Sequence, residues 1–132
     1  MNRFRTLVVD DAVFVRRAIA QILRPSEFEV VGEASNGKEA VQEYRRLQPD
    51  VVLMDIMMPE MNGIEAVRQI KQEHPDARIV MCSALGQEKV IIEALSAGAL
   101  DFIVKPFLPD KVLATLRHVM RLSQKGGEHC DT

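Results

Sequence analysis

Apolar residues along this chain follow two alternating patterns. Short runs of mostly β-branched residues recur five times, and longer stretches with apolar positions at three- and four-residue steps lie between and after them. The first pattern is typical of strands buried on both faces of a sheet, and the second is typical of amphipathic helices. The predicted strands are Thr6–Val9, Glu29–Val31, Val51–Met54, Arg78–Met81 and Phe102–Val104. The predicted helices are roughly Val13–Leu23, Gly37–Leu47, Gly63–Glu73, Glu88–Ala97, and a fifth from after Pro109 to about Leu122.

Strands that alternate with helices in this way predict an α/β fold, a doubly wound five-stranded parallel sheet with helices on both faces. Its crossover connections are expected to be right-handed. Residues 1–122 are predicted to form the domain, and residues 123–132 a flexible polar tail. Ligands of such sheets bind beyond the carboxyl ends of the strands, so functional residues are expected where each strand stops.

Composition and charge narrow the class of protein. A chain of 132 residues is long enough for one domain with its own core. Its net charge of −2 offers no basic surplus for DNA or anionic lipid, and no apolar run approaches the length of a membrane span. Cys82 and Cys130 lie far apart and suggest no disulfide framework. We therefore expect a cytoplasmic protein that neither binds DNA directly nor enters a membrane.

Polar residues stand at four of the predicted strand ends: Asp10-Asp11, Asp55, Ser83 and Lys105. Each alone has a plainer interpretation, because an Asp or Ser there often caps a helix or turn and a Lys is usually solvated. The plainer interpretation does not explain why all of these residues are predicted at the same edge of one sheet. Three clustered carboxylates repel one another and require a cation, and oxygen ligands that meet a phosphate favour Mg²⁺.

A formal charge count indicates the chemistry. Three carboxylates contribute −3, while Mg²⁺ and Lys105 contribute +3, so a phosphoryl group could approach Asp55 without net repulsion. Aspartate is a nucleophile that can accept a phosphoryl group covalently. In-line phosphoryl transfer depends on positioning and charge neutralisation more than on a general base.

Four segments resemble the CheY-like response-regulator receiver domains of two-component signalling. They are LVVDD (Leu7–Asp11), MDIMMPEMNG (Met54–Gly63), MCSALG (Met81–Gly86) and DFIVKPF (Asp101–Phe107), and the resemblance covers about residues 4–122. It implies a flavodoxin-like fold with strand order 2-1-3-4-5. It also implies a signalling domain that catalyses only its own phosphorylation and dephosphorylation.

The resemblance assigns roles to individual residues. Asp55 is expected to be the phosphoacceptor, Asp11 to bind Mg²⁺ directly and Asp10 to hold it mostly through water. The backbone carbonyl of Met57 is expected to be a further ligand. Lys105 should pair with the acceptor or its phosphoryl oxygens, and the resemblance implies a cis peptide bond before Pro106.

The remaining assignments concern signalling. Ser83 matches the switch hydroxyl and Phe102 the switch aromatic, although packing in the core is the plainer interpretation of Phe102. Met57 and Leu85 stand two residues after the acceptor and the switch hydroxyl, where the family tunes the lifetime of the phosphoaspartate. The pair Arg16-Arg17 is most simply a solvated helix face.

The expected phosphodonor is a histidine kinase. The expected output partner, such as a flagellar switch, would bind the face made by the fourth helix, the fifth strand and the fifth helix, and a separate phosphatase would end the signal. A stand-alone chemotaxis regulator is the first hypothesis, and the receiver of a multidomain enzyme such as a chemoreceptor methylesterase is the second. A haloacid-dehalogenase-type phosphatase is set aside, because Asp10-Asp11 is followed by Ala12 and Val13 rather than by a second Asp two residues after the nucleophile.

Overall fold

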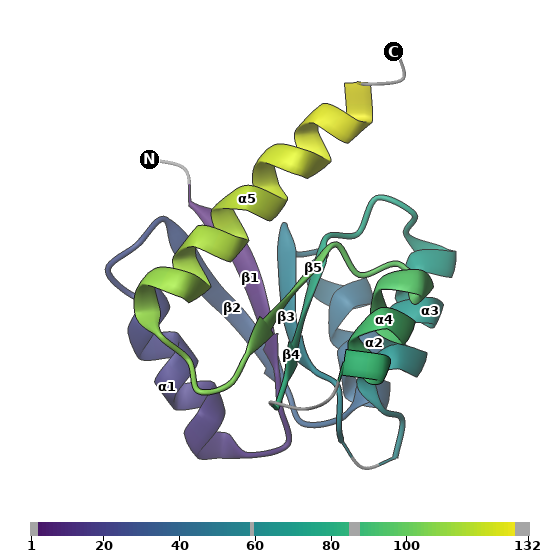
Figure 1. The fold of residues 1–132 in the computed structure, drawn as a ribbon, viewed down its shortest axis with the longest axis horizontal. Helices are drawn as coiled ribbons and strands as arrows, with labels where there is room; N and C mark the ends of the chain where they lie inside the picture. The colour runs from purple at the N-terminus through teal and green to yellow at the C-terminus, as the bar shows by residue number, and fades with distance from the viewer. Residues whose placement is uncertain (1–2, 59, 85–87, 129–132) are drawn as a thin grey trace.

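The computed structural model describes residues 3–58, 60–84 and 88–128, the last six by their backbone. Strands and helices alternate along the chain (Figure 1). The elements are β1 Phe4–Val9, α1 Val13–Leu23, β2 Phe28–Ala34, α2 Gly37–Leu47, β3 Val51–Asp55, α3 Gly63–Glu73, β4 Ile79–Ser83, α4 Glu88–Ala97, β5 Asp101–Val104 and α5 Pro109–Glu128.

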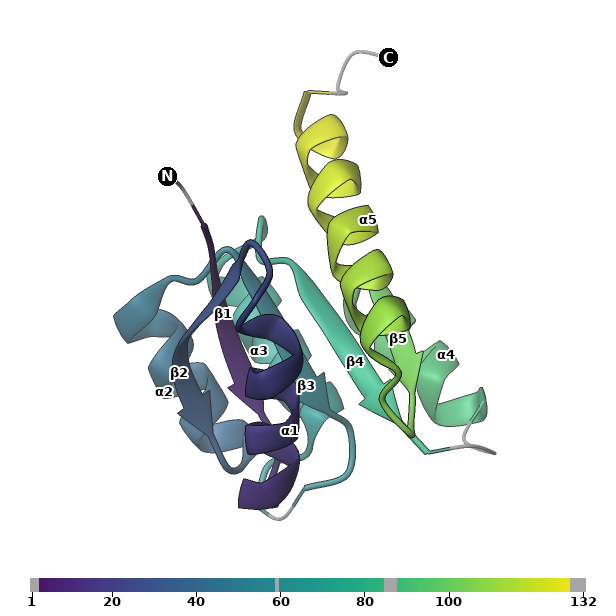
Figure 2. The ribbon, with the colours of Figure 1, turned by 90° about the vertical axis from the view of Figure 1, so that its left-hand side faces the viewer.

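The strands form one parallel sheet in the order β2-β1-β3-β4-β5, which confirms the predicted topology. The helices cover both faces of this sheet, with α1 and α5 on one face and α2, α3 and α4 on the other (Figures 1 and 2). Because strand order reverses at β1, the carboxyl ends of β1 and β3 lie side by side at the switch point.

Two hydrophobic cores result from the alternation of side chains along each strand. In β1, Leu7 and Val9 pack under α2, α3 and α4, while Val8 packs under α1 and α5. All three are almost completely buried, as is the whole of β3. A parallel strand buried on both faces has no polar face, which explains the uninterrupted apolar runs in the sequence.

Local signals in the sequence set several helix ends. Asn36 caps α2, and its side chain accepts a hydrogen bond from the backbone N–H of Glu39 at 2.8 Å. Asn62 and Glu65 form a capping box at the start of α3. Gly98 follows α4 with φ of 126°, a conformation that residues with a Cβ rarely adopt.

The end of α5 differs from the sequence prediction. The helix continues to Glu128 rather than ending near Leu122, and its last turns project beyond the amino ends of the strands (Figure 1). Once a helix has formed, each further residue gains one backbone hydrogen bond for one residue fixed and avoids the cost of nucleation, so a polar sequence can extend it without packing. The division of the chain at residue 122 into a domain and a tail stays a prediction.

Candidate functional site

The backbone and side chain of Asp10 are held at the end of β1. Its backbone N–H donates to the carbonyl of Ala34 at 3.1 Å, and its carboxylate accepts from the N–H of Ala12 at 2.9 Å. The residue is buried, whereas Asp11 beside it is exposed. Two consecutive carboxylates therefore stand at the switch point, one fixed by the protein and one open to solvent.

Asp55 ends β3, where it is buried. The chain then turns back tightly, and the N–H of Gly63 donates to the carbonyl of Ile56 at 2.8 Å. A Cβ at position 63 would lie 2.3 Å from the backbone oxygen of Asp55, so only glycine allows α3 to start this close to the strand. This close approach fixes where the Asp55 carboxylate emerges.

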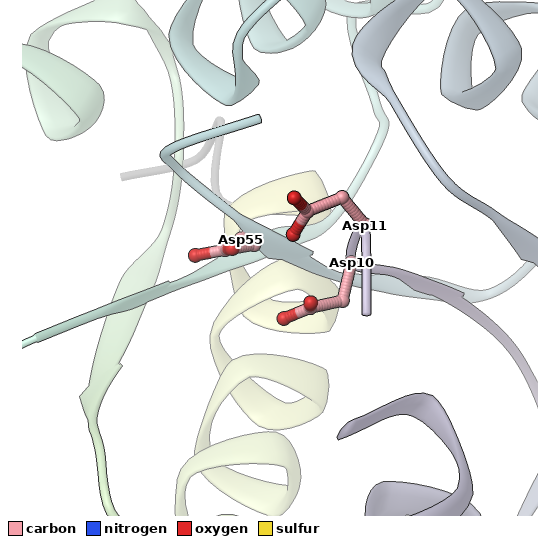
Figure 3. Close-up of side chains that lie close together, drawn as sticks. All are labelled: Asp10, Asp11 and Asp55. Carbon is pink, nitrogen blue, oxygen red and sulfur yellow. The ribbon is translucent and has the colours of Figure 1, made fainter. Parts of the chain in front are cut away.

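The fold brings the three carboxylates together (Figure 3). One oxygen from each of Asp10, Asp11 and Asp55 lies within 4.8 Å of the other two. Lys105, which follows β5, places its Nζ 3.4 Å from Oδ2 of Asp10 and 3.5 Å from Oδ1 of Asp55. Three negative groups thus face one positive group, which leaves the cluster short of positive charge.

The titration behaviour of the cluster reflects this imbalance. The pKa of Asp55 is raised to about 6, mainly by burial and then by the negative charge of Asp10, while Lys105 acts in the opposite direction. Burial by itself would lower the pKa of Lys105, but the charges of Asp55 and Asp10 outweigh it and raise that pKa. Beyond the effect of burial, both shifts are those of a site in which negative charge exceeds positive charge.

The donor set fits a hard cation. All three side-chain ligands are carboxylates, and the described residues around them bring neither a histidine nor a cysteine into the cluster. Oxygen ligands favour Mg²⁺ or Ca²⁺ over zinc, and a shallow cluster that keeps several waters suits Mg²⁺. A divalent ion here would remove the repulsion that raises the pKa of Asp55.

Ser83 and Lys105 are joined through the backbone beside this cluster. The N–H of Lys105 donates to the carbonyl of Ser83 at 2.8 Å, and the peptide bond between Lys105 and Pro106 is cis, the isomer that the resemblance implies. The Ser83 side chain is buried, and its hydroxyl has no hydrogen-bond partner among the described residues. A buried hydroxyl without a partner is unusual and requires an explanation, and a role in function is one such explanation.

The other predicted residues differ in how far their side chains are exposed. Phe102 and Val104 face outward from β5 and are 36% exposed, while Ile103 between them is buried. The interpretation of Phe102 as core is therefore wrong, because β5 is an edge strand and the helices leave this part of it uncovered. The side chain of Met57 is exposed, and Leu85 lies outside the described residues.

The sequence interpretation missed Arg16. It was predicted to lie on a solvated helix face, yet its side chain is only 15% exposed and its guanidinium donates to the backbone carbonyl of Asp10. Its Nε also donates to Glu33 on β2 at 2.7 Å. The available signal was its place in the first turns of the helix that follows the paired aspartates.

A comparison with protein families identifies the chain. The model of the response regulator receiver domain matches residues 6–117. The chain belongs to the response-regulator receiver family. Among residues 3–58, 60–84 and 88–128 of this receiver, no helix is both long and apolar enough to cross a bilayer.

Individual relatives are similar over most of the receiver. The chemotaxis protein CheY of Thermotoga maritima is 52% identical over 117 residues, which cover 89% of this chain and 98% of that protein. A protein-glutamate methylesterase of Photobacterium profundum is 51% identical over 106 residues, 78% of this chain but 27% of that enzyme. A chain of the CheX–CheY–BeF₃–Mg²⁺ complex of Borrelia burgdorferi, 38% identical, superimposes with a TM-score of 0.85 over 89% of this chain and 90% of its own.

Proposed function

We propose that this receiver accepts a phosphoryl group on Asp55 from a histidine kinase and signals as a chemotaxis response regulator of the CheY class. The observation that carries the proposal is the cluster of three carboxylates within 4.8 Å of one another, with Lys105 beside two of them. The match to CheY covers 89% of this chain at 52% identity and the match to the methylesterase covers 78% of it at 51%, which favours the first of the two hypotheses. A cytoplasmic location is part of this proposal.

Mg²⁺ is the proposed cofactor. Asp11 and Asp55 would hold it directly, Asp10 mostly through water, and the backbone carbonyl of Met57 would complete the protein ligands. When bound, the ion supplies positive charge that neutralises the phosphoryl oxygens during transfer. Asp10 is the carboxylate most constrained by its neighbours, which suits a group that acts through water rather than by direct contact.

In the proposed transfer, one carboxylate oxygen of Asp55 attacks phosphorus while the bond to the imidazole nitrogen of the donor breaks. Lys105 then pairs with a phosphoryl oxygen, since its ammonium already lies 3.5 Å from Asp55. The Ser83 hydroxyl, which has no partner among the described residues, donates to another phosphoryl oxygen. A bound metal ion would lower the raised pKa of Asp55, and the carboxylate nucleophile would then be ionised at neutral pH.

The output surface is proposed to be the face of α4, β5 and α5. Four exposed apolar side chains line α4 and β5: Ile92, Leu95, Phe102 and Val104. Ser83 ends β4 and pairs with Val104 of β5. Movement of the Ser83 hydroxyl toward a phosphoryl group would therefore disturb Val104, which lies on this face. A flagellar switch protein is the proposed partner, and a separate phosphatase would terminate the signal.

The proposal is tested by intact mass spectrometry after incubation with acetyl phosphate. The wild type is expected to gain one phosphoryl group with Mg²⁺ and none with EDTA, and Asp55→Asn is expected to gain none. Asp76→Asn, which removes an exposed aspartate outside the cluster, should behave as the wild type. Stoichiometric labelling of Asp55→Asn would show that another residue is the acceptor.

The output surface has its own test. Addition of beryllofluoride, which mimics the phosphoryl group, is expected to change amide chemical shifts on α4, β5 and α5 as well as at the site, because packed surfaces switch between discrete arrangements. Asp55→Asn should show no such response. Shift changes confined to α1 and α2 would refute the assignment of this face.

A further inference from the structure

Arg16 makes two hydrogen bonds that join the end of β1 to β2. Its Nη1 donates to the backbone carbonyl of Asp10 at 2.5 Å, and its Nε donates to Oε1 of Glu33 at 2.7 Å. Its side chain is largely buried although it belongs to the first turns of a surface helix. From these contacts we propose that Arg16 is a positioning residue, which aims the Asp11 carboxylate at the metal site.

The mechanism follows from the planarity of the peptide bond. The carbonyl oxygen of Asp10, the N–H of Asp11 and both Cα atoms lie in one plane, so a donor that fixes the oxygen fixes the plane. The direction in which the Asp11 side chain leaves the backbone is then restricted. Because Asp11 is exposed, packing of its own side chain contributes little to that direction.

The connection between β1 and α1 has no side-chain N-cap, which at other helices would fix the backbone at this point. The N-cap residue of α1 is Ala12, which offers no side-chain cap, and no acidic residue stands in the first turn. The Asp10 carboxylate turns back onto the N–H of Ala12 instead. The peptide that follows Asp10 is therefore held by two contacts: the turn that the Asp10 side chain closes, and the hydrogen bond from Arg16 to the carbonyl of Asp10. Only the second acts directly on the carbonyl oxygen.

The charge of Arg16 argues against a purely electrostatic role. A cation near the amino end of a helix opposes the helix dipole, and a cation near a Mg²⁺ site weakens the binding of that ion. Glu33 balances part of this charge. The positive charge of Arg16 is unfavourable at this position, so the geometry of its two hydrogen bonds is the better explanation for an arginine here. Residues that violate a local preference in this way are expected at functional sites.

The two roles predict opposite signs for the same substitution. If Arg16 acts only through its charge, Arg16→Met should tighten Mg²⁺ binding. If it positions Asp11, the same substitution should weaken Mg²⁺ binding by roughly tenfold or more, the size of effect typical of residues that orient metal ligands, since Mg²⁺ tolerates little distortion of its octahedral geometry. This inference rests on the proposed Mg²⁺ site.

The experiment measures Mg²⁺ affinity by calorimetric titration without any phosphodonor. Arg17→Met is the matched control, because Arg17 is the exposed neighbour on the same helix and its loss changes net charge equally. Arg16→Lys keeps the charge but loses the planar fork that reaches both acceptors, so its affinity is expected between those of Arg16→Met and the wild type. In the metal-free protein, the amide resonance of Asp11 should shift in both Arg16 variants and not in Arg17→Met.

The outcomes separate this inference from the proposed function. A wild type that does not bind Mg²⁺ would overturn the metal site itself. A wild type that binds, together with Arg16→Met that binds equally well or more tightly, would overturn only the role of Arg16. If thermal unfolding in EDTA shows that Arg16→Met does not fold, Arg16→Lys decides: affinity equal to the wild type refutes the inference, and weaker affinity with an unchanged melting curve supports it.

Discussion

Replacement of Asp55 by Asn should stabilise the metal-free protein at neutral pH. Asp55 is 6% exposed and its pKa is raised to about 6 by burial and by the neighbouring Asp10. An ionised carboxylate is therefore disfavoured in the folded state compared with the unfolded chain. Asn has nearly the same shape and carries no charge, so the substitution removes this penalty.

The magnitude follows from the size of the shift. The pKa moves from 3.8 to about 6, and each unit corresponds to about 1.4 kcal/mol, so the penalty reaches about 3 kcal/mol. Below pH of about 4 both states hold the proton and the penalty vanishes. As pH rises from about 4 to 6 the unfolded chain releases its proton first, so the free energy of unfolding of the wild type falls. Above pH of about 6 the loss is complete.

The assay is urea unfolding followed by circular dichroism in EDTA, at several pH values between 4 and 8. Asp55→Asn should exceed the wild type by about 3 kcal/mol at pH 7 and match it near pH 4, with an unchanged dependence on urea. Saturating Mg²⁺ should stabilise the wild type more than the variant, since only the wild type keeps the full ligand set. Asp76→Asn, at an exposed position, supplies the control for loss of one charge.

Two results would refute this reasoning. If the difference between Asp55→Asn and the wild type stays constant from pH 4 to pH 8, titration of Asp55 is not its cause. If Asp55→Asn is less stable than the wild type at pH 7, the ion pair with Lys105 outweighs burial and repulsion, contrary to the direction of the pKa shift.

Four further outcomes are expected. Asp11→Ala should weaken Mg²⁺ binding and phosphorylation together in a titration, while its metal-free stability stays or rises as repulsion within the cluster is relieved. Gly37→Ala should destabilise the fold in urea by about 2 kcal/mol or more, because the added Cβ would lie 2.1 Å from the backbone oxygen of Met61; a variant as stable as the wild type would contradict that close contact. The double variant Met57→Asn plus Leu85→Glu should release phosphate faster than the wild type, since polar side chains can orient the attacking water, and an equal rate would count against apolar control of the lifetime. A phosphatase that needs an amide at position 57 to align its glutamine should not act on the wild type.

Most of the fold was determined by local features of the sequence. The apolar runs of β1 and β3 could be buried only inside a parallel sheet, and the starts of α2 and α3 were marked by Asn caps. The first four helices begin and end where the periodicity of apolar residues predicted. Strand order came from the family resemblance, because periodicity does not say which strands are neighbours.

For the candidate site, the sequence determined which residue types are present but not how they are arranged. Paired aspartates, a third aspartate and a lysine at strand ends indicated a cation and a phosphoryl group, but their mutual distances and the raised pKa of Asp55 depend on which strands adjoin. Short-range patterns carry no information about separations across the sheet.

Only the tertiary structure decided the surroundings of the remaining residues. Phe102 is 36% exposed because β5 lies at the edge of the sheet, where the described helices cover that side chain only in part. Arg16 is largely buried because α1 packs beside β2 and brings its guanidinium to Glu33 and to the backbone of Asp10. Both outcomes depend on contacts between segments distant along the chain, and hydrophobic periodicity within one helix or strand does not specify those contacts.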